Sequence, residues 1–344
     1  MPNRIAVDGP VLPRFPRSLI HPLGPIFPKL PKALRRHLLH LWHHRQWGNF
    51  RNPSTFPEKM QWRILNDHRT ILGVATDKLA AKEYARRAAA HAGLPLRLPE
   101  TYWVGTDVRE LQSLAAQLPS RWVLKPNHSS GRFRILDTAQ EPVDWEELIR
   151  AGDRWMQPDE EEVSYGHPGY GAARKLLLAE ERIGAAENPP ATLRTQVACG
   201  RIISFSYSFG TMHPSSSVPW RRYRYNPSFE RVVDSKAEGA APLSERSRID
   251  ELGHSERVQL TRTIQTLAEG LDQVRVDLYV EDQIWFGELT MYSGSGLSKY
   301  EPAVAREIAE YWVLPDLDAS DPREPEWREQ LAFRPKGTLQ GSAR

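Results

Sequence analysis

The segment from residue 274 to 290, VRVDLYVEDQIWFGELT, constrains the fold more than any other part of this chain. Apolar and polar side chains alternate along both of its halves, and such alternation is typical of a strand with one buried face. Asp282 and Gln283 lie at the polar centre, where a two-residue turn would join strands over 274–280 and 284–291. The sequence therefore predicts an antiparallel hairpin in a sheet that is buried on one side.

This turn also determines which side chains face each other. It places Asp277 directly opposite Glu288 and Arg275 opposite Thr290, so that these four side chains share one face. The other face receives an apolar set that we expect to be buried, namely Val274, Val276, Leu278, Leu289 and Met291. Directly opposed carboxylates have Cβ atoms about 5 Å apart and repel each other. We therefore expect a positive charge between them.

A hard divalent cation is one way to supply that charge. Mg²⁺ binds carboxylate oxygens and keeps its other positions for water and nucleotide phosphate, and Arg275 could hold a phosphate oxygen or a developing negative charge. The alternative is a solvated sheet face on which Asp277 and Glu288 both point to water. A turn with an odd number of residues would also change the register. The hairpin alone leaves both interpretations open.

A second segment, RWVLKPNHSSGRFRI at residues 121–135, predicts a strand that ends at Lys125, a loop containing Ser129, Ser130 and Gly131, and a further strand. Backbone N–H groups of such a loop can surround phosphate oxygens while the lysine supplies a point charge. It is not a Walker A loop, because the chain contains no G-x-x-x-x-G-K-[ST] sequence. The alternative is an ordinary hairpin without a ligand.

A third segment, RKLLLAEERI at residues 174–183, is an apolar run with a strand expected over 175–179, and it ends in Glu180 and Glu181. A strand that leaves the core between two lobes could offer backbone groups and a carboxylate to an adenine and a ribose. The alternative is a pair of solvated acids at a strand end.

Composition excludes several classes of protein. With 344 residues, 40% of them hydrophobic and 26% charged, the chain is neither disordered nor fibrous. Its single cysteine, Cys199, rules out an internal disulfide, and we expect it to be buried in an apolar strand. No run approaches the 20 or so apolar residues of a membrane span, so a cytoplasmic protein is expected. A net charge of +3 is too small to indicate a nucleic-acid partner.

The N-terminal part of the chain is expected to be irregular and then helical. Eight prolines mark residues 1–32 as an arm. A helix over 31–47 would bury Leu34, Leu38, Leu41 and Trp42. It would present His37, His40 and His44 on a solvated face or, alternatively, to a metal. Further helices are expected from about Pro57 and over 77–91, with Thr76 as the cap of the latter. Strands follow, with Gly200 in a hairpin turn and a helix over 255–271, so the sequence predicts an α+β fold.

Seven segments occur in a fixed order between residues 46 and 305: NPSTFPEKMQW, TDKLAAKEYA, VLKPNHSSG, LLLAEERI, VRVDLY, FGELT and GSGLSKYEP. Together they resemble the TupA-like branch of the ATP-grasp superfamily, which is named for teichuronopeptide biosynthesis. The resemblance implies two α+β lobes that grip ATP and Mg²⁺, after a helical and proline-rich N-terminal extension. The corresponding divisions are an arm and basic helix at 1–50, a helical substrate subdomain at 51–120, a small lobe at 121–182, a large lobe with the metal site at 183–315, and a peripheral tail at 316–344.

The resemblance also implies an activity, the ATP-dependent joining of a small-molecule carboxylate to an amine through an acyl phosphate. In this family, an amino acid or amine would be joined to a sugar acid or other small carboxylate in polysaccharide or specialised-metabolite biosynthesis. The roles that the resemblance implies are catalysis for Arg275 and Lys125, metal binding for Asp277 and Glu288, and nucleotide binding for Lys78, Lys125, Ser129, Ser130, Gly131, Glu180, Glu181 and Arg194. Thr290 stands where many relatives have asparagine, so the resemblance does not extend to a second metal ion.

Two alternatives remain at this point. The same nucleotide site could serve a kinase that phosphorylates a hydroxyl. The segment PWRRYRYNPSF at residues 219–229, in which arginine and tyrosine interleave, could instead belong to a non-catalytic glycan- or nucleic-acid-binding protein. The simpler interpretation of that segment is a strand with two different faces.

Overall fold

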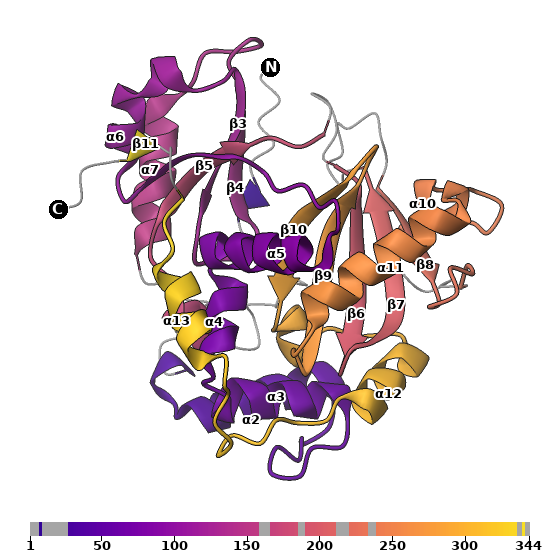
Figure 1. The fold of residues 1–344 in the computed structure, drawn as a ribbon. Helices are drawn as coiled ribbons and strands as arrows, with labels where there is room; N and C mark the ends of the chain where they lie inside the picture. The colour runs from indigo at the N-terminus through magenta and orange to yellow at the C-terminus, as the bar shows by residue number, and fades with distance from the viewer. Residues whose placement is uncertain are drawn as a thin grey trace.

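The computed structural model describes residues 7–8, 27–157, 166–184, 190–210, 220–232, 239–335 and 339–340. Two β-sheets lie beside each other, and helices cover them and fill the space beneath (Figure 1). Consecutive strands pair mainly as antiparallel neighbours, and the helices are grouped rather than inserted after every strand. This arrangement confirms the α+β class.

The first sheet has the strand order β1-β4-β3-β5-β2-β11, and only β11 pairs in parallel with its neighbour. Its strands are β1 (Val7–Asp8), β2 (Thr101–Gly105), β3 (Arg121–Pro126), β4 (Arg132–Asp137), β5 (Leu177–Glu181) and β11 (Leu339–Gln340). Helices α6 (Val108–Ser113) and α7 (Trp145–Met156) pack on one face around the buried Trp103, Trp122 and Leu177. Side chains alternate along a strand, so Lys125 and Glu180 belong to the other face.

The second sheet has the order β10-β9-β6-β7-β8 and is antiparallel throughout. Its strands are β6 (Thr192–Ala198), β7 (Arg201–Phe209), β8 (Arg221–Tyr225), β9 (Gln273–Val280) and β10 (Ile284–Thr290). The apolar set expected from the hairpin is buried, since none of Val274, Val276, Leu278, Leu289 and Met291 is more than 3% exposed. Helices α10 (Arg248–Glu251) and α11 (His254–Ala268) belong to this half, and α11 packs against β9 and β6.

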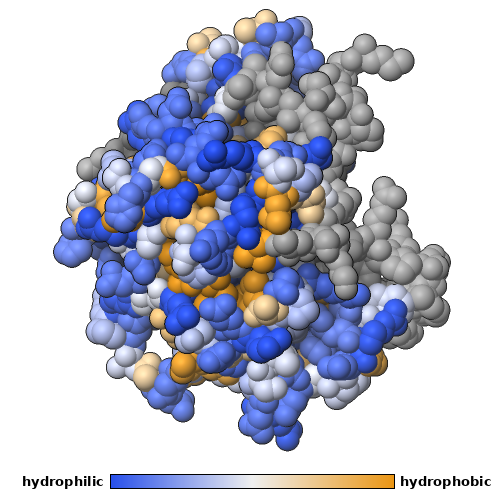
Figure 2. Space-filling view, turned by 90° about the vertical axis from the view of Figure 1, so that its right-hand side faces the viewer, coloured by the Kyte–Doolittle hydropathy of each residue, from blue (hydrophilic) through white to orange (hydrophobic). Residues whose placement is uncertain are grey.

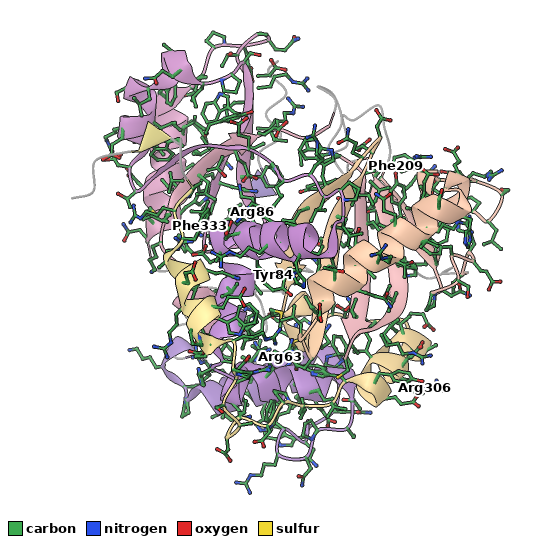
Figure 3. All side chains as sticks on the ribbon, viewed as in Figure 1. Arg63, Tyr84, Arg86, Phe209, Arg306 and Phe333 are labelled. Atoms are coloured by element: carbon green, nitrogen blue, oxygen red, sulfur yellow. The ribbon has the colours of Figure 1, made fainter. Side chains whose placement is uncertain are left out.

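A group of helices closes the base of the molecule: α2 (Lys32–His44), α3 (Phe56–Asn66), α4 (Thr70–Thr76), α5 (Lys78–Ala92), α9 (Pro168–Ala172), α12 (Pro302–Tyr311) and α13 (Glu324–Ala332), with the short 3-10 helices η1 (Phe27–Lys29) and η3 (Ser293–Gly296). A third 3-10 helix, η2 (Ala115–Gln117), packs against α6 beside the first sheet. As expected, α3 begins beside Pro57, and a capping box between Thr55 and Glu58 fixes its start. Arg63 on α3 reaches the ends of β9 and β10, where it donates to the carbonyls of Gln273 (2.9 Å) and Met291 (2.8 Å) (Figure 3). These contacts join the helical base to the second sheet.

The first long helix, α2, differs from its prediction. Its buried residues are Arg35, Arg36, Leu39 and His40, whereas Leu34 and Leu41 are exposed. His37 stacks on Trp47 and Phe50, with ring centroids 4.7 and 4.0 Å away. The prediction of a solvated histidine face is therefore wrong, because hydrogen bonds and ring stacking make the polar side of this helix its packing face. The metal alternative also fails, since the described residues contain no group of three or more potential metal ligands.

Three smaller predictions are also corrected. Cys199 is exposed rather than buried, because it forms the turn between β6 and β7 together with Gly200, with φ of 46° and 77°. The helix over 78–92 is capped by Asp77 rather than Thr76. The tail from residue 316 is not merely peripheral, since α13 packs on α4 and α5 and buries Trp327.

Most of the proline-rich arm lies outside the described residues, so its expected irregularity stays a prediction. No helix in the described ranges has the length and hydropathy to cross a membrane. On the face that Figure 2 shows, hydrophilic residues dominate and hydrophobic ones gather in a central strip.

Candidate active site

A narrow cleft lies where the two sheets and the helical base meet. Its walls come from the end of α4, the first turns of α5, strands β3 and β5 of the first sheet, and β10 of the second. The lining residues are Ala75, Thr76, Lys78, Ala81, Lys82, Pro99, Lys125, Tyr170, Glu180, Phe286, Gly287, Glu288 and Leu289. Three lysines and two glutamates converge on this cleft between smaller apolar side chains, and convergent polar groups of this kind are typical of a site for a charged small molecule.

One wall of the cleft holds a carboxylate between two ammonium groups. Glu180 is 3% exposed, and its side chain pairs with Lys125 Nζ through Oε1 and with Lys82 Nζ through Oε2, the latter at 3.0 Å. Burial alone would raise the pKa of Glu180, but the two lysines outweigh it and lower the pKa to about 2. Glu180 is therefore ionised at neutral pH, and the alternative interpretation, a solvated acid at a strand end, is wrong for this residue.

Helix α5 supplies two lysines to the cleft. Lys78 and Lys82 are four residues apart and so lie on the same side of the helix. Its start is fixed by Asp77, which is fully buried, accepts from Ala80 N (2.9 Å) and pairs with Arg174 Nη2 (2.6 Å). Asn127, in the loop after β3, donates to Asp77 Oδ2 at 2.7 Å. The buried Asp77 thus ties the start of α5 to the predicted phosphate loop.

The ammonium group of Lys78 reaches the same loop by donating to the carbonyl oxygen of Ser129. Burial lowers the pKa of Lys78 to about 8, and the charge of Lys125 adds to this effect. Lys78 also interacts electrostatically with Glu288 on β10, which helps to lower the pKa of that carboxyl. Lys78 therefore links the predicted loop to the acidic pair on the second sheet.

The hairpin β9–β10 brings Asp277 directly opposite Glu288 and Arg275 opposite Thr290, which confirms the predicted pairing. The turn itself differs, since Ile284 pairs with Val280 and leaves three residues in the loop. A β-bulge between Phe286 and Glu288 compensates for this shift. The predicted register at the acidic pair is correct only because of this bulge.

The positive charge expected between the two acids is present in the chain itself. The Arg275 guanidinium donates to both oxygens of Asp277 at 2.6 Å and to Glu288 Oε1 at 3.2 Å. Thr290 Oγ1 donates to the same Glu288 oxygen at 2.9 Å, and Arg194 Nε lies 3.6 Å from Asp277 Oδ2. Burial raises the pKa of Asp277, and the two-pronged contact with Arg275 opposes this rise and favours the carboxylate.

This donor set suits Mg²⁺ carried by a nucleotide. Asp277 and Glu288 offer hard oxygen ligands, and Glu288 lines the cleft with 38% of its side chain exposed. Two carboxylates are too few for an all-protein metal cage, in agreement with the absence of a larger ligand group in the described ranges. They are the number that Mg²⁺ typically takes when substrate phosphates complete its shell.

The predicted site residues do not all meet in the cleft. Lys78, Lys125, Glu180 and Glu288 line it, and Arg275, Asp277 and Arg194 adjoin Glu288. Ser129 is connected through Lys78, whereas Ser130 and Gly131 are not among the lining residues. Glu181 is not among them either, and its carboxylate accepts from Glu100 N at 3.0 Å.

Sequence analysis missed Lys82 and Asp77. The four-residue spacing between Lys78 and Lys82 was a signal for the former, because both must then face the same way on a helix. Asp77, directly before the helix, is a preferred capping residue. Nothing in the sequence indicated Tyr170, which comes from a distant segment, and Phe286 was part of the FGELT motif but was not assigned to the site.

No protein-family profile matches the sequence, and no curated protein is significantly similar to it. Among solved structures, the ATP-grasp ligase PsnB complexed with a minimal precursor is 13% identical, with a TM-score of 0.37 over 74% of this chain and 67% of that one. The D-alanine–D-alanine ligase from Helicobacter pylori is 14% identical, with a TM-score of 0.39 over 70% of this chain and 62% of that one. The corresponding ligase from Bacillus anthracis, complexed with ATP, is 12% identical, with a TM-score of 0.34 over 62% and 55%. The chain spans 55% of the last structure's length, and likeness at this level carries no weight beside the geometry of the cleft.

Proposed function

We propose that this protein is an ATP-dependent ligase that joins a carboxylate to an amine through an acyl phosphate, with ATP and Mg²⁺ bound in the cleft. One observation carries the proposal: three lysines of α5 and β3 lie near a pair of directly opposed carboxylates that Arg275 bridges. Cationic groups for phosphate oxygens and hard oxygen ligands for a divalent ion are the parts that phosphoryl transfer needs. The ordered motifs of the sequence support the same assignment.

In this proposal each residue has a role in positioning or charge neutralisation. Lys78 and Lys125 hold phosphate oxygens, and Glu180 keeps Lys125 in place while offering an oxygen toward a ribose. Asp277 and Glu288 hold Mg²⁺, which when bound neutralises charge on the transferred phosphoryl group. Arg275 faces the same region and stabilises the negative charge that develops on the activated carboxylate.

The finer assignment is that the protein belongs to the TupA-like branch of the ATP-grasp superfamily. There the carboxylate would be a sugar acid or other small acid, and the amine an amino acid, in polysaccharide or specialised-metabolite assembly. The loop with Ser129, Ser130 and Gly131 would close over the phosphates, and its link to α5 through Lys78 supports that role.

The reaction class is tested by trapping the activated acid. The full chain is incubated with ATP, Mg²⁺ and a panel of sugar acids and amino acids, and ADP release is measured with and without hydroxylamine. Release that depends on a carboxylate, together with formation of its hydroxamate, is the expected result. A stable phosphate ester without hydroxamate would contradict ligation and identify a kinase.

A matched pair of variants tests the site itself. Glu288→Gln is expected to abolish ADP release, because it removes a metal ligand in the cleft. Asp282→Asn makes the same chemical change in the exposed turn of the same hairpin and should retain full activity. Equal activity in both variants would remove the metal assignment.

A further inference from the structure

Three lysines line the cleft, and the proposed reaction uses only Lys78 and Lys125. The third, Lys82, lies one turn further along α5 than Lys78 and keeps 13% of its side chain exposed. Burial of an ammonium group is costly unless the group is paired and hydrogen-bonded. The contacts of Lys82 therefore indicate what this lysine does in the cleft.

Lys82 has three hydrogen-bond partners within the chain. Its Nζ donates to Glu180 Oε2 (3.0 Å), to Thr101 Oγ1 and to the carbonyl oxygen of Pro99 (3.3 Å). Thr101 on β2 is the strand partner of Glu180 on β5, so two of the three acceptors belong to adjacent strands. An ammonium group has three protons to donate, and all three are used here. Lys82 is therefore fixed in position and has no proton left for a ligand.

Lys125 is held less firmly than Lys82. In the part of the chain that the structure describes, its Nζ has one ion-pair partner, Glu180 Oε1, and 20% of its side chain is exposed. Burial lowers the pKa of Lys82, and repulsion from Lys125 adds to this effect although Glu180 opposes it. The two ammonium groups thus compete for a single carboxylate. Lys125 is the one that an incoming anion could draw away, because it has fewer contacts to lose.

We propose that Lys82 is a positioning residue that allows Lys125 to leave Glu180 and bind the nucleotide. Before ATP binds, Glu180 keeps Lys125 in place; when ATP binds, Lys125 moves to a phosphate oxygen, and Lys82 stays as the countercharge of Glu180. This inference rests on the proposed function, which gives Lys125 a phosphate to bind. Glu180 is 3% exposed, and a buried carboxylate left without any cation is strongly destabilised. Lys82 therefore acts on the nucleotide through Glu180 and Lys125, without touching it.

A double-mutant cycle tests this role through nucleotide affinity. Binding of a non-hydrolysable ATP analogue with Mg²⁺ to the full chain is measured by calorimetry. Lys82→Met should weaken binding by about tenfold or more, because Lys125 then stays on Glu180 and its charge-assisted contact with phosphate is lost. Adding Glu180→Gln should restore most of the affinity, since a neutral amide needs no countercharge and releases Lys125. If Lys82 were merely structural, the second substitution would add to the loss instead of reversing it.

Lys59→Met is the matched control. Lys59 on α3 is also partly buried and donates to two backbone carbonyls, those of Ala309 (2.7 Å) and Trp312, but it does not line the cleft. Urea unfolding should show a loss of stability in both lysine variants, because each loses the hydrogen bonds of a partly buried ammonium group. Only Lys82→Met should lose affinity for the ATP analogue.

A crystal structure with the same analogue and Mg²⁺ tests the movement itself. Lys125 Nζ should lie within about 3 Å of a phosphate oxygen and no longer contact Glu180. Lys82 should keep its contacts with Glu180 Oε2 and Thr101 Oγ1.

Three results would overturn the proposal: unchanged affinity in Lys82→Met, a double variant that binds no better than Lys82→Met, or an equal loss of affinity in Lys59→Met. A complex in which Lys125 remains on Glu180 would count equally against it, as would a wild type that binds no nucleotide. Binding needs no turnover, so the expected pattern without hydroxamate formation would retain the role of Lys82 and refute the ligase. Hydroxamate formation without that pattern would do the reverse.

Discussion

Gly287 is the residue on which the geometry of the acidic pair depends. It lies in the bulge that restores the register of β10, and a Cβ atom added there would be 2.7 Å from the carbonyl oxygen of Asp277. That is roughly 0.8 Å closer than a favourable nonbonded contact. The two atoms nearest to the added Cβ are the carbonyl oxygen and carbon of Asp277, which belong to the backbone and cannot move aside without shifting the strand. Gly287→Ala should therefore lower the free energy of unfolding by about 1–3 kcal/mol.

The effect on activity should be larger than the effect on stability. Without the bulge, Glu288 would pair with Val276 and point into the buried apolar face. Even a partial shift of this kind misplaces the carboxylate that we propose as a metal ligand, and a displacement near 1 Å costs about a hundredfold in rate. We expect urea unfolding to give the stability loss and ADP release to fall by about that factor.

Gly171→Ala is the matched control. Gly171 lies in the short helix α9, and an added Cβ meets no atom within 4 Å. The same substitution should there be neutral or stabilising by up to about 1 kcal/mol. Wild-type stability and activity in Gly287→Ala would refute the account of the bulge, and an equal loss in both variants would show that the effect is not specific to it.

Three further predictions concern charged groups. The ATP affinity of the wild type, measured by calorimetry, should fall as the pH rises through about 8, because Lys78 then loses the proton that favours phosphate binding. In Lys78→Met the affinity should be weaker and should not change over this pH range. Asp272 pairs with Arg63 at 2.6 Å, and its pKa is lowered to about 2. Its contribution of about 2 kcal/mol to the free energy of unfolding is therefore present above pH 4 and lost as the pH falls toward 2. Urea unfolding of Asp272→Asn should lack this acid-dependent loss of stability. Asp277→Asn should destabilise the chain by about 3 kcal/mol in thermal unfolding without metal, because it removes the carboxylate that pairs with the largely buried Arg275. A raised melting temperature would show instead that repulsion between Asp277 and Glu288 dominates.

The hairpin was predictable because its side chains alternate with the period of a strand, and its bounds agree with the structure within one residue. Its turn was not, since the sequence alone does not tell whether two or three residues form the loop. The prediction of the Asp277 and Glu288 pair is correct because the bulge offsets the extra turn residue. Gly287 was the only local sign of this, and a glycine inside a strand often marks a bulge.

The packing faces of polar helices were less predictable. Hydrophobic spacing assigned the wrong side of α2 to the core, because the buried Arg36 donates to Gln61 Oε1 (2.6 Å) and to the carbonyl of Ser295 (2.7 Å). Gln61 comes from α3 and Ser295 from a segment about 260 residues further along the chain than Arg36. A partner so distant cannot be inferred from local periodicity, so a buried polar network of this kind is found only when the fold is known.

The positive charge that the opposed carboxylates require comes first from Arg275. The chain therefore compensates its own acidic pair before any ligand binds, and the carboxylates can be held in position without metal. Glu288 is the more exposed of the two and shares Arg275 at a longer distance than Asp277 does. A cation that enters the cleft with a nucleotide would thus meet Glu288 first, while Arg275 stays fixed by Asp277 and directed at the same region. Repulsion between the acids predicted a cation between them, and the structure shows that the cation that holds the pair in place is an arginine.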